Sequence, residues 1–542
     1  MAIDWINSIN SYYTDQYIYL SINNSEPPSE SVAAIYDNEL FKKGLLLRNS
    51  DNLRRYLTES DDTTAIYLYQ KILSLKVERE QYRSQLFSDS VVYELTHEID
   101  DKERILYNLS GWYKEQMQYD NISWTDVRSE LKENEVAIEF VNYGYIDQYF
   151  ALVLRKDYDY PKLVKLPNFK NEPQEKRDNA WKWYLHNLDF ALRYQFSAQP
   201  EEPHFLEFVG DAGEIYQYGG NGTDLYNALW QPLEEYIHEG ETIYFSPVGV
   251  LHQLSIEALP ISSSEVLADK YDLRRVSSTR KLTQHTSKET ITTATLYGGI
   301  TYDVDVKDRA VCSMYDDGVD RGSVSDLVGT IEEVENISQM LRNRKVKYQI
   351  YSADKANEES FKALSGKHQD VLHIATHGFF WPDSVAQSKK YFAGRSTDAN
   401  RHYIDPLNRC GLYFAGANLA LRGNGNLLLE GVQDGILTGK EISLLDLRGT
   451  KLVVLSACKT GIGEVTSDGV FGLQRAFKQA GVETIIMSLW EVDDEATQEL
   501  MTTFYRYWFS GKNKREAFQQ AQVELRRTRP DSYYWAGFIM LD

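Results

Sequence analysis

The sequence predicts an α/β protein built on a doubly wound, mostly parallel sheet that follows a helical N-terminal region. Short runs of β-branched and apolar residues recur in the second half of the chain without polar alternation, as expected for strands covered on both faces. Stretches with helical spacing of apolar residues separate these runs. Strands that alternate with helices form parallel sheets, so the pattern indicates this fold class.

The elements of this sheet follow the apolar pattern along the chain. Strands are expected at 294–300, 345–352, 371–378, 451–458 and 484–490. Helices are expected at 328–343, 357–365, 467–480, 494–509 and 513–527. Two stretches, 302–326 (rich in Asp and Gly) and 379–430 (many Gly and Asn), are predicted to be long surface loops. Loops of that length in a compact domain are usually functional or mobile.

A smaller α/β unit is expected before this sheet. The runs 136–143 and 149–156 predict a hairpin, because a short connection containing Gly separates them. Another strand is expected at 242–249, which ends in the turn signal Pro-Val-Gly.

The N-terminal part of the chain reads as helix. From about 31 to 118, apolar residues recur at three- and four-residue spacing with charges between them. No clean repeat of tetratricopeptide length is visible, although these helices could be remnant hairpins of such an array. We therefore predict three regions: helices at 1–130, an α/β half at 131–285 and a second α/β domain at 286–542.

Composition excludes several classes of protein. The net charge of −22 over 542 residues argues against a nucleic-acid binder, which normally shows a basic face. The sequence contains no long uncharged apolar run, so no membrane span is predicted. The N-terminus does not resemble a secretory signal. Three cysteines do not make a disulfide framework in a chain of this size. A cytoplasmic location is the expectation.

Two predicted strands end in residues capable of catalysis. One runs into His377 and Gly378, and the other runs into Cys458. Ligands of open α/β sheets bind beyond the carboxyl ends of the strands, so imidazole and thiol emerge together if these strands are parallel neighbours. An imidazole can take the proton of a thiol, and the N–H groups of Gly378 and Cys458 could form an oxyanion hole.

Other interpretations of these residues stay open on the sequence alone. A Cys at the end of an apolar strand is often a buried structural thiol, and a His there is often a hydrogen-bonded structural residue. His373 is a possible second base, although its mid-strand position predicts burial. Cys312 and Cys410 lie in loop-like sequence without a basic partner. No Cys or His pairs have zinc spacing, so neither a metal nor another cofactor is expected.

Ten motifs, in order, resemble the CHAT family of caspase-like peptidases, which are often joined to tetratricopeptide repeats and are related to separase. They are YFSPVGVLHQLSIEALP, VSSTR, LVGTIEEV, LHIATHGFF, DPLNRCGLYFAGAN, DGILTGKEISLLDL, LVVLSACKTGIGEV, GVFGLQRAFKQAG, IIMSLWEVDDEAT and YYWAGFIML. The resemblance runs from near residue 132 to the end of the chain. It implies a caspase-like sheet preceded by a non-catalytic, pseudo-caspase α/β half.

The resemblance also implies a catalytic dyad of His377 and Cys458. Where it leads us to expect Gly-Glu-Gly before a helix, this chain has Ser467-Asp468-Gly469, whose carboxylate is one methylene shorter. In the separase relatives an acidic residue after the corresponding Leu-Trp selects arginine. Asp494 matches that position best, and Asp468 is a second candidate. Acidic residues near 494 are equally expected where a helix begins.

The function implied by the resemblance is a regulated cysteine endopeptidase that cleaves a protein substrate, in bacterial defence or cell-death signalling. We expect the site to become ordered either when an activating protein partner binds the N-terminal helices or when one of the long loops is cut. Binding to nucleic acid or to a membrane is not expected. One alternative is a protein-binding scaffold with a silent protease half. A cysteine hydrolase of small amides is another.

Overall fold

The protein is described here from a computed structural model of the chain. It describes residues 27–43, 63–83, 89–109, 122–143, 148–166, 222–262, 265–284, 290–303, 323–380, 406–422, 433–457, 460, 463–466, 469–490 and 492–542. Among these residues, no helix combines the length and the apolar character needed to cross a bilayer.

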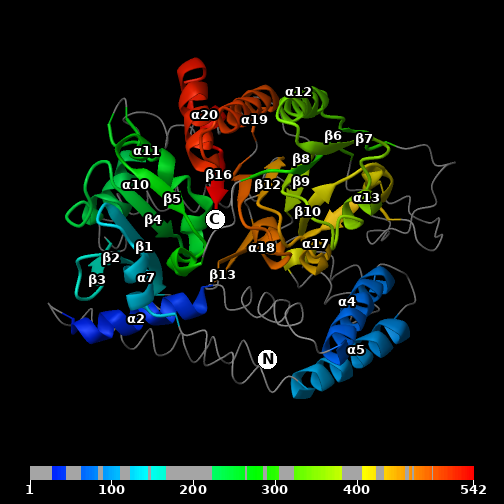
Figure 1. The fold of residues 1–542 in the computed structure, drawn as a ribbon, viewed down its shortest axis with the longest axis horizontal. Coiled ribbons are helices and arrows are strands. Elements are labelled where there is room, and N and C mark those ends of the chain that lie inside the picture. The colour runs from blue at the N-terminus through cyan, green and yellow to red at the C-terminus, as the bar shows by residue number, and fades with distance from the viewer. Residues whose placement is uncertain are drawn as a thin grey trace.

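A six-stranded sheet forms the larger lobe, in the order β16-β15-β12-β8-β6-β7 (Figure 1). Five of its strands run parallel, and only β16 is antiparallel to its neighbour. The strands are β6 (Thr293–Ile300), β7 (Lys347–Ala353), β8 (Val371–Ala375), β12 (Leu452–Ser456), β15 (Ile485–Ser488) and β16 (Phe538–Leu541). The predicted mostly parallel sheet is confirmed.

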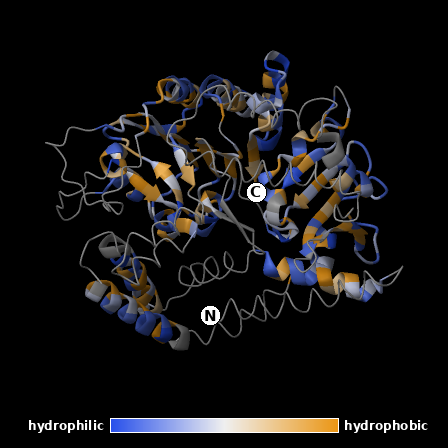
Figure 2. Ribbon diagram, turned by 180° about the vertical axis from the view of Figure 1, so that it is seen from behind, coloured by the Kyte–Doolittle hydropathy of each residue, from blue (hydrophilic) through white to orange (hydrophobic). Residues whose placement is uncertain are grey.

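Both faces of this sheet are buried, as the unbroken apolar runs predict. In β12, Leu452 and Val454 point into the core beneath α12 (Gly329–Asn343) and α19 (Asp494–Phe509). Val453 and Leu455 alternate to the opposite face, which α13 (Glu358–Lys362), α17 (Gly439–Leu444) and α18 (Leu473–Gln479) help to cover. The strands in the middle of each lobe carry much of the hydrophobic colour in Figure 2.

The smaller lobe contains a five-stranded sheet in the order β3-β2-β1-β4-β5. Its strands are β1 (Glu135–Tyr143), β2 (Gln148–Arg155), β3 (Lys162–Lys165), β4 (Thr242–Ser246) and β5 (Asp272–Arg275). The predicted hairpin is the antiparallel pair β1 and β2, and β4 joins β1 in parallel. Short helices complete the lobe: α7 (Trp124–Glu130), α10 (Gly222–Leu229) and α11 (Leu267–Lys270).

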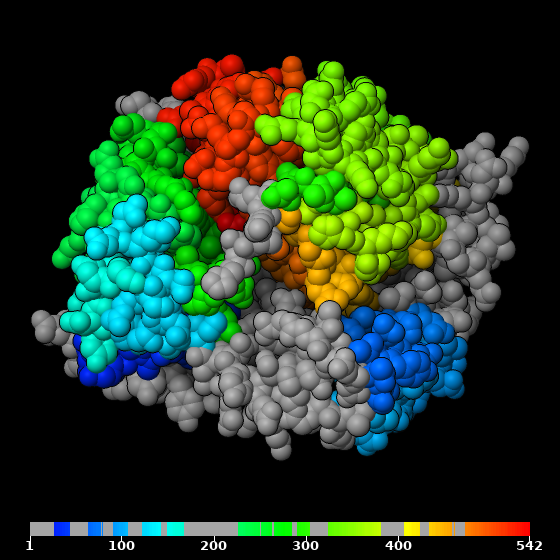
Figure 3. All heavy atoms as spheres, in the orientation of Figure 1, coloured from blue at the N-terminus to red at the C-terminus, as the bar shows by residue number. Residues whose placement is uncertain are grey.

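The two lobes share one hydrophobic core. Helix α20 (Lys514–Thr528) follows α19, and buried residues of both helices belong to the cluster that contains the inner face of β1 and β4. In the space-filling view their red atoms fill the surface between the two lobes (Figure 3). The short helix α21 (Ser532–Trp535) then leads into β16. Burial of this interface ties the first sheet to the second.

Two sequence predictions need correction. The helix expected at 467–480 begins only at Leu473, because residues 463–466 and 469–472 pair as the hairpin β13–β14. Glycines at both ends of β14, with Val470 and Phe471 between them, favour extended backbone over helix.

The second correction concerns the long loop expected at 379–430. Its described parts include most of β9 (Gly378–Phe380), β10 (Cys410–Tyr413) and α16 (Ala417–Leu421). β10 pairs with β9 and with β11 (Ile436–Thr438) in a small antiparallel sheet. These strands have only three or four residues each, which is too short for a periodic signal in the sequence.

In the predicted helical region 1–130, three described helices precede α7: α2 (Ser29–Lys42), α4 (Thr63–Arg83) and α5 (Asp89–Leu109). Helix α2 packs with α7 on the outer face of the first sheet, through residues such as Ile35 and Leu40. Helices α4 and α5 pack on each other, and α4 also contacts α17 of the larger lobe. The N-terminal helices therefore touch both lobes.

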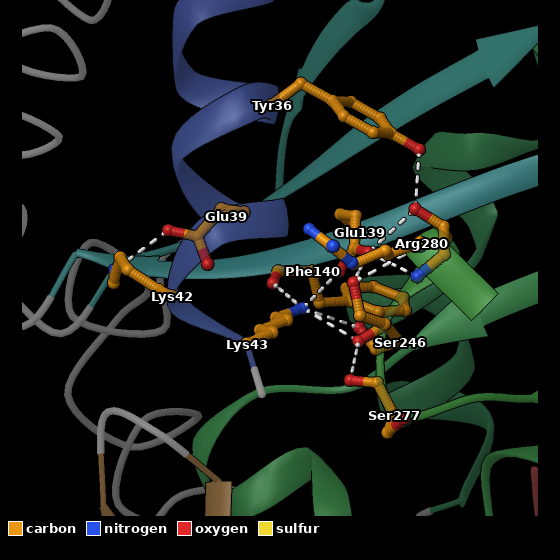
Figure 4. A network of polar contacts seen from close by, with 11 residues as sticks. Tyr36, Glu39, Lys42, Lys43, Glu139, Phe140, Ser246, Ser277 and Arg280 are labelled. Atoms are coloured by element: carbon orange, nitrogen blue, oxygen red, sulfur yellow. Dashed lines mark hydrogen bonds and ion pairs between the residues drawn. The ribbon is translucent and has the colours of Figure 1, made fainter. Parts of the chain in front are cut away.

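A buried lysine fastens α2 to the first sheet. The Lys43 ammonium lies 2.6 Å from a carboxylate oxygen of Glu139 in β1, and donates to the Phe140 carbonyl at 2.8 Å and to the Ser246 hydroxyl at 3.0 Å (Figure 4). The Glu139 side chain is 0% exposed. Its other oxygen accepts bonds from Ser278 and Thr279 in the 3₁₀ segment that follows β5.

We predict that Lys43→Met destabilises the folded chain by about 3–5 kcal/mol, because it leaves the Glu139 carboxylate buried without its cation. Urea denaturation measures the change. The control, Lys102→Met, removes an ammonium from an exposed pair with Glu98 and should cost under about 1 kcal/mol. Adding Glu139→Gln to Lys43→Met should restore part of the loss. A Lys43→Met protein as stable as the control would contradict this account.

Candidate active site

The position of His377 follows from the strand order of the larger sheet. The chain passes from β6 outward to β7 and then returns to the other side of β6 as β8. Such a switch point opens a crevice at the carboxyl ends of the two strands. Tyr302 follows β6 there, and His377 follows β8. The Tyr413 N–H of β10 donates to the His377 carbonyl at 3.0 Å, which fixes the backbone as β9 begins.

The contact that His377 makes through its ring indicates which tautomer the neutral imidazole adopts. Its Nε2 atom lies 2.8 Å from the carbonyl oxygen of Ser325. A carbonyl oxygen can only accept a hydrogen bond, so Nε2 must carry the hydrogen in this contact. The remaining ring nitrogen, Nδ1, is then the basic one, and it is the atom able to take a proton from a nucleophile.

Tyr302 supports the same imidazole from one side. Its ring centroid lies 5.2 Å from that of His377, at an interplanar angle of 50°. Its hydroxyl contacts the Thr376 hydroxyl at 2.8 Å and accepts a hydrogen bond from the backbone N–H of His377 at 3.4 Å. Burial raises the pKa of the Tyr302 phenol, and the carboxylates of Asp326 and Asp494 raise it further. Tyr302 is therefore a neutral phenol at physiological pH.

Cys458 lies outside the described residues, but the strand that leads to it is well defined. β12 runs parallel to β8, and the register pairs Ser456 with Ala375. The Thr376 N–H continues the ladder by donating to the Ser456 carbonyl at 3.3 Å. His377 and Cys458 each follow a member of the Ala375–Ser456 pair by two residues in the sequence. The two strands thus end side by side at the same edge.

Residues on both sides of Cys458 are anchored to the end of β15. The Ser488 hydroxyl donates to the Ala457 carbonyl at 2.6 Å, and the Ser488 N–H donates to the Thr460 hydroxyl at 3.0 Å. Ser488 and Thr460 are both buried. Sequence reasoning missed this pair. Its only signal is a hydroxyl residue in each of the motifs IIMSLW and SACKTG.

The other histidine of β8 is enclosed in the core. His373 is 0% exposed, with its Nε2 2.8 Å from a carboxylate oxygen of Glu333 in α12. Its Nδ1 lies 3.4 Å from the Tyr505 hydroxyl, and Glu333 also accepts from Ser456. An imidazole buried among these partners cannot meet a substrate, so the burial predicted for His373 is confirmed and the role of second base is excluded.

The remaining candidates lie at different depths. Gly378 is half-buried and begins β9, directly after His377. Cys410 is buried in β10, whereas Cys312 and Asp468 lie outside the described residues. Asp494 is exposed in the first turn of α19. The cap of that helix is Asp493, which accepts the Ala496 N–H at 2.8 Å.

Comparison with known proteins shows which family this chain resembles. The profile of the CHAT domain matches residues 220–541. Tetratricopeptide repeat protein 28 of Mus musculus is 35% identical over 101 residues, which is 18% of this chain and 4% of that protein. Its Homo sapiens counterpart is 32% identical over 112 residues, which is 20% of this chain and 4% of that protein. The chain therefore spans a small part of these relatives.

Two solved structures are similar to this chain. The Saccharomyces cerevisiae separase–securin complex has a TM-score of 0.43 at 10% identity, over 94% of this chain and 40% of that one. The Arg-specific cysteine proteinase gingipain R has a TM-score of 0.32 at 9% identity, over 60% of this chain and 66% of that one. Both TM-scores lie below 0.5, so neither likeness bears on the mechanism. Because the CHAT profile covers more than half of the chain, including every strand from β6 to β16, the protein belongs to the CHAT-domain family.

Proposed function

We propose that the chain is a cysteine endopeptidase in which Cys458 is the nucleophile and His377 is the general base. The observation that carries the proposal is the state of His377. It stands at the carboxyl end of β8 with Nε2–H on the Ser325 carbonyl, beside the parallel strand that leads to Cys458. A base with a defined tautomer, next to a thiol-bearing strand, suits nucleophilic catalysis.

In this mechanism, Nδ1 of His377 takes the proton of the Cys458 thiol, and the thiolate attacks the carbonyl carbon of the scissile peptide bond. The backbone N–H groups of Gly378 and Cys458 are the proposed donors to the resulting oxyanion. His377 returns the proton to the leaving amine as the C–N bond breaks, which leaves a thioester on Cys458. A water molecule, deprotonated by His377, hydrolyses this thioester and regenerates the thiol.

The physiological role that fits a regulated endopeptidase of this family is bacterial defence or cell-death signalling. A scaffold with a silent protease half would leave Cys458 unreactive, and a hydrolase of small amides would not select peptides. Labelling of the full chain with an electrophilic peptide ketone separates these functions. Covalent modification of Cys458 that depends on the peptide sequence is expected only of the endopeptidase.

The first test of the dyad is substitution of its members. Cys458→Ala and His377→Ala should each lower cleavage of a protein substrate by several orders of magnitude while the chain stays folded. Cys410→Ala and Cys312→Ala are the matched controls and should stay active. Cleavage is measured by gel, and folding by circular dichroism. A Cys458→Ala protein that still cuts the substrate would exclude this mechanism.

We further propose that Asp494 lines the pocket for the side chain just before the scissile bond and favours arginine there, with Asp468 as a second candidate. Two observations support Asp494. The capping role at the start of α19 belongs to Asp493, and the Asp494 carboxylate is near enough to Tyr302 to raise the pKa of its phenol. A carboxylate there could form a bidentate pair with a guanidinium.

Asp494→Asn should therefore raise the activation free energy for cleavage after Arg, obtained from kcat/KM, by about 2–3 kcal/mol. The stability of helix α19 should change little. Peptides with Arg before the scissile bond should be cut faster than peptides with Leu or Asp. Glu495→Gln removes the neighbouring carboxylate, which pairs with Arg529 at 3.0 Å, and serves as the control. An Asp494→Asn enzyme that keeps a full preference for Arg would remove Asp494 from the pocket.

Regulation through the N-terminal helices is the last part of the proposal. Helix α4 packs on α17 of the larger lobe, while Tyr67 of α4 and Tyr93 of α5 are 66% and 65% exposed. We propose that a protein partner binds this helical pair. Deleting residues 1–120 is a poor test, because it also removes Lys43 and leaves Glu139 unpaired.

A sharper test replaces residues 63–109 by a Gly/Ser linker of equal length and keeps α2 in place. If the helical pair regulates the site, peptide turnover should change by about 5-fold or more while the melting temperature of the remainder is kept. The Tyr67→Ser, Tyr93→Ser chain, which retains both helices, is the control for altered packing and should turn over like the unaltered chain. Equal turnover with and without residues 63–109 would exclude this route of regulation.

A further inference from the structure

Asn418 lies outside the proposed dyad, yet its side chain reaches the segment that holds His377. It belongs to the short helix α16 and is 1% exposed. The Val324 N–H donates to its Oδ1 at 2.8 Å, and its Nδ2 donates to the Val324 carbonyl at 2.9 Å. The amide thus satisfies both polar backbone groups of one residue, as a neighbouring strand would.

The same residue also binds the chain that leaves β6. The Asn418 N–H donates to the Tyr302 carbonyl at 3.3 Å, and the Tyr302 N–H donates to the Asp326 carboxylate at 3.3 Å. Asn418 therefore joins Tyr302 to Val324, two residues that the sequence separates by more than twenty positions.

Both of the segments that Asn418 joins act on His377. Ser325, the residue after Val324, supplies the carbonyl that accepts from Nε2 at 2.8 Å. Tyr302 supplies the phenol that lies against the imidazole and accepts a hydrogen bond from the backbone N–H of His377. The segment at 323–326 has no regular secondary structure, so the position of the Ser325 carbonyl depends on these few bonds and on the half-buried Val324 side chain, which packs against the core.

Asn418 itself stands on a rigid support. All five residues of α16 are buried, and the helix begins after Gly416, whose φ of 90° is readily adopted by glycine. The Gly416 N–H donates to the Thr301 carbonyl at 3.3 Å, and the Ala415 N–H donates to the Ala356 carbonyl at 2.9 Å. A buried helix fastened at its start can hold an exposed segment in place.

We infer that Asn418 is a positioning residue for the base: it holds the Ser325 carbonyl against Nε2 and thereby keeps His377 in the Nε2–H tautomer. The inference rests on the proposed function for its catalytic consequence. Neutral imidazole exchanges between two tautomers, and an acceptor fixed beside Nε2 favours the form whose Nδ1 can take a proton. Without that acceptor, part of the population would carry its hydrogen on Nδ1 and could not act as base.

Asn418→Asp tests this with little change of shape. The aspartate keeps one acceptor for the Val324 N–H but sets its second oxygen against the Val324 carbonyl, where Nδ2 donated. The matched control is Asn513→Asp at the start of α20, where the side chain accepts the Glu516 N–H and a carboxylate caps equally well. If Asn418→Asp fails to fold, Asn418→Ser replaces it with a smaller, uncharged side chain that cannot span both bonds.

The first readout does not depend on activity. The full chain is labelled with ¹⁵N-histidine, and the His377 signals are assigned by their loss in His377→Gln. We expect the Nε2–H tautomer in the unaltered chain and in Asn513→Asp, and a mixture of tautomers in Asn418→Asp. An unchanged His377 tautomer in a folded Asn418→Asp chain would overturn the inference.

The second readout is the rate at which chloroacetamide alkylates Cys458 as a function of pH. In Asn418→Asp the rate constant at pH 7 should fall by about two- to fivefold, with an altered pH profile, because only part of the His377 population remains able to act as base. A profile that matches Asn513→Asp would also overturn the inference. If the unaltered Cys458 reacts no faster than a peptide thiol, the proposed protease function fails, whereas the tautomer result still decides the role of Asn418.

Discussion

The site depends on one constraint, the parallel pairing of β8 with β12 in the register that sets Ala375 opposite Ser456. Both strands are buried along their whole length, so a slip by one residue would exchange the side chains that face the two halves of the core. Apolar packing thereby fixes which residues follow the strands at the common edge.

The smaller lobe is bound to the larger sheet by more than the linker between the lobes. Helices α19 and α20 contribute to one core with the first sheet, and the Asp542 N–H after β16 donates to the Arg275 carbonyl at the end of β5. Lys43 then fastens α2 to the middle of β1 and to the end of β4. The first sheet thus connects the N-terminal helices mechanically to the second.

The sequence was sufficient for the strands and helices with long apolar runs, and for the histidine at the end of β8. It could not indicate the small sheet of β9, β10 and β11, whose strands are too short to show a period. It also could not indicate Ser325, because the group that holds His377 is a backbone carbonyl, which every residue possesses. Asn418 ends the motif DPLNRCGLYFAGAN, but the sequence could not indicate its role, since that role depends on contacts made across separate segments.

The sheets and the segments around them therefore control different properties of His377, the proposed base. Burial of β8 determines where the His377 backbone stands, and changing that position would require breaking the core. The proton on its ring depends instead on the Ser325 carbonyl, which lies in an irregular segment held by a few hydrogen bonds and by the half-buried Val324 side chain. Segments of this kind open at much lower free energy than a buried strand. Displacement of residues 323–326 could thus change the protonation of His377 while both sheets stay intact, which would be a means of regulating the proposed protease.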